Sequence, residues 1–180
     1  TVLSLTTANA TNFENLTGGS NAETLNGDDN ANILRGKGGA DTLNGNGGND
    51  TLDSGSYDST NDKLYGGAGD DTLIGNGGDN ILDGGEGADT ITSGSGLDTI
   101  ITRSGDGGSN LSNADIIADF TNGSDIIGLI GLNYSDLTVQ RGTGGYSSHV
   151  VVQETSSGDF LLIIQNQSIG NIDDNDFSAI

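Results

Sequence analysis

Several residue types are absent or scarce in this chain of 180 residues. It has no cysteine, proline, methionine or tryptophan, and aromatic residues make up 4%. Without cysteine no disulfide framework can form, so a bound metal is the remaining way to cross-link a small fold. Basic residues number 5 against 26 acidic ones, a formal net charge of −21. This balance argues against a nucleic-acid partner, because phosphates need basic side chains.

Long apolar runs are missing too. No stretch reaches the ~20 residues of a membrane-spanning helix, so no membrane span is predicted. No signal peptide is visible at the N-terminus, and because the first residue is Thr1 rather than Met we expect a fragment of a longer protein. Low hydrophobicity with high net charge is typical of chains that cannot collapse unaided. If metal supplies the missing interactions, its binding free energy becomes folding free energy.

Glycine, by contrast, is abundant, with 32 residues, and much of it belongs to a nine-residue repeat such as GGAGDDTLI at Gly66–Ile74. A short fixed period indicates a stacked repeat architecture. The eighth position is apolar at Leu16, Leu25, Leu34, Leu43, Leu52, Leu64, Leu73, Leu82, Ile91 and Ile100. The sixth carries a side-chain oxygen at Glu14, Glu23, Asn32, Asp41, Asp50, Asp62, Asp71, Asn80, Asp89 and Asp98.

Each unit predicts a three-residue strand and a sharp glycine turn. One inward leucine per strand cannot form a core alone, so the units must stack, with consecutive strands alternating between two parallel sheets. Ser54–Ser56 break the phase and are expected to form a bulged loop at one edge. We therefore predict an all-β fold: a right-handed parallel β-roll over residues 1–113, opened by a strand within residues 1–12, and a β-rich cap over residues 114–180.

The turns of this fold would bring carboxylates together in two columns. Carboxylates stacked one strand spacing apart, roughly 5 Å, repel one another, and the turns leave backbone carbonyls without partners. Calcium resolves both difficulties because it takes about six to eight oxygen ligands from carboxylates and carbonyls. The repeat therefore predicts several bound Ca²⁺ ions.

The units GGAGDDTLI and GGEGADTIT (Gly84–Thr92) resemble the nonapeptide G-G-x-G-x-D-x-U-x of the RTX (repeats-in-toxin) proteins, over about half the chain. In that family each ion bridges two loops that lie two units apart. The resemblance implies side-chain ligands at Glu23, Asn32, Asp41, Asp50, Asp62, Asp71, Asn80, Asp89 and Asp98. It implies carbonyl ligands at Lys37, Gly39, Asn46, Gly48, Gly66, Gly67, Ala68, Gly69, Gly75, Asn76, Gly77, Gly78, Gly84, Glu86, Ser93 and Ser95.

Within this scheme Asp71 is shared by two ions, one with Asp50 and one with Asp89. Asp41 and Asp62 pair across the insertion, where other residues replace two of the family's glycines. The weaker members, which lack a charge or carry a longer side chain, are Asn32, Asn80 and Glu23.

After the repeats, ADIIADFTNGSDII (114–127) resembles the segment that follows them in many RTX proteins. Residues 137–140, 149–154 and 159–165 are expected to form further strands. IDDNDFSAI (172–180) resembles the ending of type I secretion substrates, which implies an exporter as partner. Asp115, Asp119 and Asp125 either bind a further ion or are solvated turn residues.

Two classes of function remain open. One is a calcium-triggered folding and secretion module of a larger secreted bacterial protein. The other is an extracellular module that binds polysaccharide, a cell surface or ice. No active site is predicted: His149 is the only histidine and lies in an apolar run, where a strand residue is the simpler interpretation.

Overall fold

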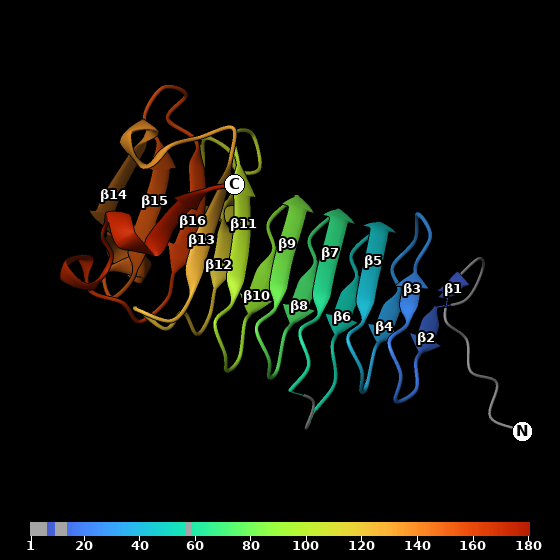
Figure 1. Ribbon diagram of the computed structural model, residues 1–180. Coiled ribbons are helices and arrows are strands. Elements are labelled where there is room, and N and C mark those ends of the chain that lie inside the picture. Colours follow the sequence, from blue (N-terminus) through green and yellow to red (C-terminus); the bar gives the residue numbers. More distant parts are fainter. Residues whose placement is uncertain (1–6, 10–13, 57–58) are drawn as a thin grey trace, which may run out of the picture.

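The computed structural model describes residues 7–9, 14–56 and 59–180. In this part of the chain two β-sheets face each other and run the length of an elongated molecule, with a broader cap at one end (Figure 1). The helical elements here are short 3₁₀ turns: η1 (Leu111–Asn113), η2 (Tyr134–Asp136), η3 (Gly144–Tyr146), η4 (Ile169–Asn171) and η5 (Asp174–Asp176). In the same residues no helix is long and apolar enough to cross a membrane.

Each sheet takes every second strand of the roll. The first sheet has the order β1 (Thr7–Asn9), β3 (Thr24–Asn26), β5 (Thr42–Gly47), β7 (Lys63–Ala68), β9 (Ile81–Glu86), β11 (Thr99–Arg103), β13 (Ile126–Ile130) and β17 (Phe177–Ala179). The second has the order β2 (Asn15–Thr17), β4 (Ile33–Arg35), β6 (Thr51–Asp53), β8 (Thr72–Ile74), β10 (Thr90–Thr92), β12 (Asp115–Ile117), β16 (Phe160–Ile164), β15 (Val150–Glu154) and β14 (Leu137–Arg141).

The apolar eighth positions set the register of the sheets. Leu43 pairs with Leu64 and Leu64 with Leu82, all in parallel strands, and the same holds along the second sheet. These side chains meet between the sheets as a thin core, and those from Leu25 to Ile100 are 0–1% exposed. Leu16, near the open end, is only partly buried. The predicted parallel β-roll is thus confirmed. Within residues 1–12, where its first strand is expected, the structure describes residues 7–9, which form β1.

The turns depend on left-handed backbone conformations. In the units that begin at Gly36, Gly45, Gly66, Gly75, Gly84 and Ser93, the second and fourth positions both have positive φ, as at Gly67 (112°) and Gly69 (126°), which glycine adopts at low cost. Asparagine replaces the second glycine at Asn46 (75°) and Asn76 (59°), and it is one of the few other residues that tolerate this region. The first glycine has a different role, because a methyl group at Gly66 would overlap the carboxylate of the same unit.

The insertion between β6 and β7 does not change the register of the neighbouring strands. The turn between β6 and β7 is three residues longer than the other repeat turns on the same edge, yet β5 and β7 pair as the other repeat strands do. The bulge that the sequence predicts at residues 54–56 does not begin at Ser54, which is buried and donates from its hydroxyl to the carbonyl of Gly75 at 2.6 Å. Residues 57 and 58 lie outside the described part of the chain.

Both sheets continue across residue 113 into the cap. β12 pairs in parallel with β10, and β13 pairs in parallel with β11. β16 adds to β12 in parallel, and β15 and β14 then follow antiparallel. The cap therefore buries the last strands of the roll by extending their own hydrogen-bond ladders.

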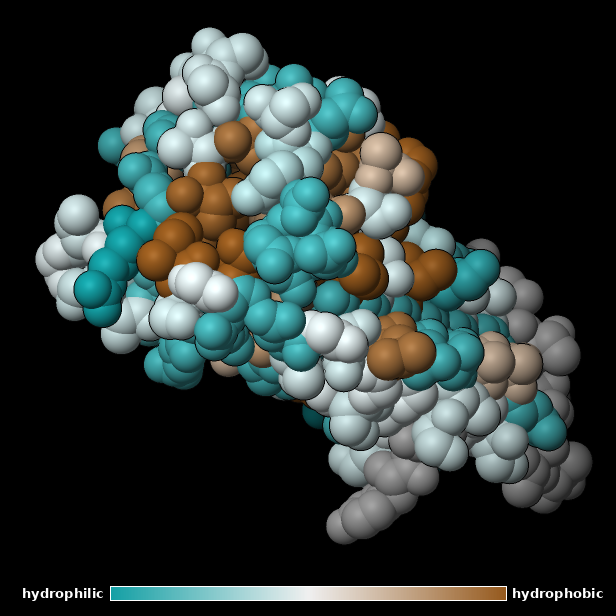
Figure 2. Space-filling view, turned by 60° about the vertical axis from the view of Figure 1, so that its left-hand side comes forward, coloured by the Kyte–Doolittle hydropathy of each residue, from teal (hydrophilic) through white to brown (hydrophobic). Residues whose placement is uncertain are grey.

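The cap also gathers exposed apolar side chains. In the view of Figure 2 the brown residues concentrate at the cap end, whereas the roll is mostly pale or teal. In the described part of the chain, the exposed large apolar side chains are Ile130, Tyr134, Ile169 and Ile180 in the cap and Leu97 in the roll.

Candidate metal centre

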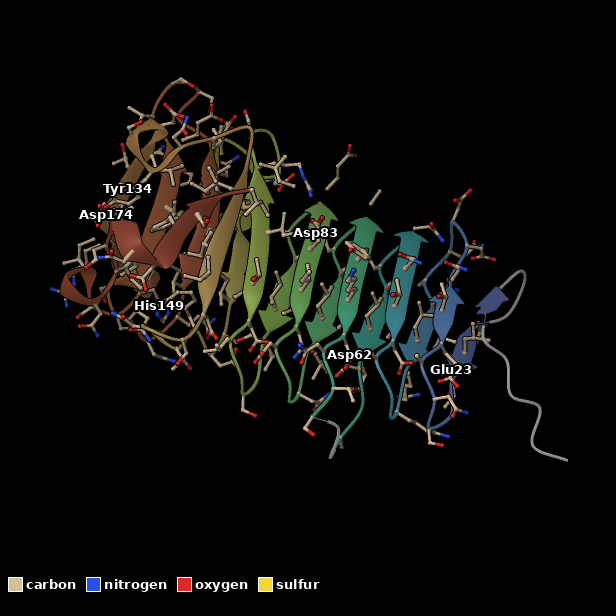
Figure 3. The ribbon with its side chains drawn as sticks, in the orientation of Figure 1. Glu23, Asp62, Asp83, Tyr134, His149 and Asp174 are labelled. Carbon is tan, nitrogen blue, oxygen red and sulfur yellow. The ribbon has the colours of Figure 1, made fainter. Side chains whose placement is uncertain are left out.

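The sixth-position side chains form two columns, one on each edge of the roll. Each of these residues directly precedes a strand, as Asp71 precedes β8. Strands of the two sheets run in opposite directions (Figure 1), so their starting points lie on opposite edges. Figure 3 shows Glu23 and Asp62 on the same edge, in the turns before β3 and β7.

A hydrogen-bond ladder joins the members of each column. The backbone N–H of one sixth-position residue donates to a side-chain oxygen of the next, as Asp50 does to Asp71 Oδ1 at 2.7 Å. In the same column the bonds are Asn32 N to Asp50 Oδ1 (2.6 Å), Asp71 N to Asp89 Oδ1 (2.8 Å) and Asp89 N to Asp115 Oδ1 (3.0 Å). In the other they are Glu23 N to Asp41 Oδ1 (2.8 Å), Asp41 N to Asp62 Oδ1 (2.7 Å), Asp62 N to Asn80 Oδ1 (2.9 Å), Asn80 N to Asp98 Oδ1 (2.8 Å) and Asp98 N to Asp125 Oδ1 (3.3 Å).

The second carboxylate oxygen is buried without such a bond. Asp71, for example, is 2% exposed and uses Oδ1 alone in the ladder. Among the described residues, Oδ2 is buried and accepts no hydrogen bond in Asp50, Asp71, Asp89, Asp98 and Asp115. A buried carboxylate oxygen without a partner is costly, and a cation removes that cost. The residues present therefore fit a metal ion.

Backbone carbonyls lie beside these oxygens. A methyl group built on Gly66 would meet both Asp71 Oδ2 and, at 2.5 Å, the carbonyl of Gly84 in the next loop of that edge. Built on Gly36, it would meet the carboxylate of Asp41 and the carbonyl of Ser54. Within the residues that the structure describes, no three acidic, histidine or cysteine side chains gather into one cluster. The site is therefore a pair of carboxylates completed by carbonyl oxygens, a donor set that suits calcium.

Burial makes these carboxylates hard to ionise without a cation. It raises the pKa of Asp71 to about 7, with the charges of Asp89 and Asp50 adding to the effect. The pKa values of Asp50, Asp89 and Asp98 are raised to about 6, again mainly by burial. Binding of a divalent cation would reverse this effect, since an opposite charge favours the ionised form.

Asn80 fills its place in the column differently. Its Oδ1 accepts from Asp62, but its Nδ2 donates to the carbonyls of Gly75 and Gly78, both at 3.1 Å. The amide thus satisfies carbonyls that a cation would otherwise use. Asn80 belongs to two of the predicted pairs, so both are expected to bind calcium more weakly than the Asp71 pairs.

Replacement of this amide should strengthen calcium binding. Asn80→Asp supplies a carboxylate oxygen and removes the donor that competes for the two carbonyls. We expect the calcium concentration at half-folding to fall about tenfold, equivalent to ~1.4 kcal/mol. Asn61→Asp is the matched control, because Asn61 is exposed in the same edge and gains the same charge outside the column. Calcium titration followed by circular dichroism measures both, and equal midpoints would contradict the assigned role of Asn80.

Glu23 and Asn32, near the N-terminal end of the columns, have fewer free side-chain oxygens for a metal ion. Glu23 turns one carboxylate oxygen back to the N–H of Gly19 at 3.0 Å. Asn32 Oδ1 accepts from Asp28 N at 2.8 Å. Both residues keep their places in the ladder, but each has an oxygen already engaged within its own loop.

The aspartates of the cap do not gather into a single site. Asp115 ends the column of Asp89, whereas Asp125 ends the column of Asp98. Asp119 accepts from the N–H groups of the turn that begins at residue 93. The sequence did contain a signal for the column ends, because Asp115-Ile-Ile and Asp125-Ile-Ile repeat the aspartate and inward apolar residue of the units.

Comparison with known families agrees with this geometry. The model of the RTX calcium-binding nonapeptide repeat, in four copies, matches residues 17–52, 57–91 and 74–108. The chain belongs to the RTX calcium-binding nonapeptide-repeat family. No curated protein sequence matches it.

Several solved structures resemble the RTX chain. The AlgE6R3 subunit of the Azotobacter vinelandii mannuronan C5-epimerase is 21% identical, with 89% of this chain and 80% of that one covered and a TM-score of 0.40. The AlgE6R2 subunit of that enzyme is 19% identical, with coverages of 88% and 91% and a TM-score of 0.48. The extracellular lipase LipA from Serratia marcescens is 14% identical, with coverages of 87% and 39% and a TM-score of 0.42.

Proposed function

We propose that the chain is a calcium-triggered folding and secretion module of a larger secreted protein, without catalytic activity of its own. The observation that carries the proposal is the pair of buried carboxylate columns, whose second oxygens need a cation. Extracellular calcium modules have dissociation constants of roughly 10⁻⁴ to 10⁻³ M, far above the free calcium concentration of a bacterial cytoplasm. The chain would therefore stay unfolded before export and fold on meeting extracellular calcium.

The segment that resembles a secretion signal supports this order of events. In the folded state Phe177 is 8% exposed, and β17 pairs with β13 at the end of the first sheet. Asp176 is also buried, in the short turn before β17. An exporter that reads these residues would have to do so before they are packed into the cap, so recognition should precede calcium-driven folding.

The outward faces of the roll lack the regularity that a ligand-binding ladder needs. Thr42 is paired with Lys63, and Asn44 with Tyr65, which in turn pairs with Asp83. A flat row of threonines, which an ice-binding face would require, is thus interrupted by charged and aromatic side chains. This irregularity favours the folding module over the alternative of a binding surface.

The column arrangement gives a direct test of this function. Asp71 is shared by two predicted ions, so Asp71→Ala should abolish cooperative folding or raise its calcium midpoint at least tenfold, ~1.4 kcal/mol or more. Glu23→Ala removes one acidic side chain near the open end and should shift the midpoint by less than about twofold. Calcium titrations monitored by far-ultraviolet circular dichroism compare the two variants. Equal shifts would contradict the proposed function.

A further inference from the structure

One carboxylate pair lies at the junction of the repeats and the cap. Asp115 opens β12, outside residues 17–108 that the family model matches. Its Oδ1 accepts the backbone N–H of Asp89 at 3.0 Å, the same bond that joins consecutive members within the repeats. The two residues are separated by 26 positions rather than 18, because residues 104–114 form a longer connection.

Asp89 and Asp115, here called the junction pair, share with the Asp71 pairs a buried second carboxylate oxygen that accepts no hydrogen bond from the described residues. Asp89 and Asp115 are 0% and 1% exposed, and in the described part of the chain the Oδ2 atom of each accepts no hydrogen bond. The loop that precedes Asp89 also keeps the repeat backbone, with positive φ at Gly85 (98°) and Gly87 (136°). Two buried carboxylates and an intact repeat loop therefore meet here.

The basic side chain of Arg103 already forms ion pairs with other carboxylates. Arg103 contacts Asp83 at 2.6 Å and Asp106 at 3.4 Å, and Asp106 also accepts the backbone N–H of Arg103 at 2.8 Å. Asp106 lies close enough to add its negative charge to the field at Asp89 and Asp115. The arginine thus pairs with two other carboxylates, and among the described residues no basic side chain forms an ion pair with Asp89 or Asp115.

The other column ends differently. Asp125 accepts from Asp98 N at 3.3 Å through Oδ1, and its Oδ2 accepts from Thr121 N at 2.7 Å and from Ser93 Oγ at 3.4 Å. Asp119 is also engaged by N–H groups through both oxygens. Protein donors therefore engage both oxygens of Asp125, whereas Oδ2 of Asp115 has no protein donor among the described residues.

We propose that Asp89 and Asp115 bind one further calcium ion, which joins the last repeat to the first strand of the cap. The inference rests on the proposed function, because it extends the calcium columns beyond the nonapeptide units. The ion would fix β12 against β10 and make docking of the cap itself depend on calcium. No equivalent ion binds at Asp125.

The test compares two isosteric variants of the full chain. Asp115→Asn keeps the Oδ1 acceptor for Asp89 but removes the charge, and Asp125→Asn is the matched control at the other column end. Equilibrium dialysis at saturating calcium counts bound ions, while circular dichroism confirms that each variant is folded. We expect Asp115→Asn to bind one ion fewer than the unmodified chain and Asp125→Asn to bind the same number.

An unchanged count for folded Asp115→Asn would overturn the inference, as would an equal loss in both variants. If Asp115→Asn fails to fold, a crystal structure of the unmodified chain grown in calcium decides the question. Density between Asp89 and Asp115 with oxygen distances of about 2.3–2.6 Å supports the junction ion. Ions at the repeat pairs but none at the junction would overturn this inference alone, whereas absence of ions from the repeat pairs would overturn the proposed function.

Discussion

Removal of calcium by a chelator at neutral pH is expected to abolish the β-structure of this chain. With a formal net charge of −21 and buried carboxylates in both columns, the metal-free roll loses more through repulsion and desolvation than its thin leucine core supplies. Far-ultraviolet circular dichroism should show a disordered spectrum, with β signal restored by millimolar calcium. Magnesium should restore little, because it demands a tighter octahedral site. A chelated sample with full β content would contradict the calcium requirement.

Lowering the pH tests whether ionised, buried carboxylates are the reason that the calcium-free chain unfolds. The pKa of Asp71 in the metal-free fold is about 7, whereas an unfolded chain has aspartate pKa values near 4. Because the folded pKa is the higher one, the metal-free fold is penalised at neutral pH, and the penalty shrinks as pH falls from about 7 towards 4. In chelator, lowering the pH to about 5.5 should therefore recover part of the β signal. A β signal that declines over this range would contradict burial of the carboxylates as the cause.

Deletion of residues 114–180 is expected to leave a chain that stays largely disordered even at ~10 mM calcium, tenfold above the weakest sites of extracellular modules. The deletion exposes the outer edges of β10 and β11, and it removes the acceptors of Asp89 N and Asp98 N. A terminal unit of a stacked repeat needs a cap that covers its apolar side. Circular dichroism of residues 1–113 against calcium measures the outcome.

Deletion from the other end serves as the control. Removal of residues 1–22 takes away β1 and β2, where Leu16 is only partly buried, and leaves every predicted side-chain ligand from Glu23 onward in place. We expect this chain to fold with a calcium midpoint within about threefold of the full chain, a change below ~1 kcal/mol. If residues 1–113 folded as cooperatively as the full chain, the cap would be dispensable for folding.

The repeat allowed the roll and the order of its columns to be predicted because each unit adds one strand at a fixed spacing. Once Leu64 is placed inside, the period places Leu82 beside it and Asp71 beside Asp89 two units apart. The predicted neighbours Asp41 and Asp62 remain joined despite the insertion, and β5 and β7 keep their pairing. Local sequence therefore carried most of the information about this half of the chain.

The cap could not be placed in the same way, because its pairings join distant segments. Ile127 pairs with Phe177, and Asp115 pairs with Leu162, contacts that no short period encodes. The link from Arg103 to Asp83 and Asp106 was also missed, since it depends on the course of an irregular loop. Asn80 was recognised as lacking charge, but its two hydrogen bonds to carbonyls needed the three-dimensional structure.

A core that is one side chain deep has a consequence for size. In a globular domain the fraction of surface that is buried rises with chain length, so larger domains become easier to stabilise. The roll instead grows along one axis, by roughly one strand spacing of about 4.8 Å for every two units, and its cross-section stays constant. Its ratio of surface to volume therefore hardly improves as units are added. Additional length brings a proportional demand for metal ions, and a longer roll of this design would be no less dependent on calcium than a short one.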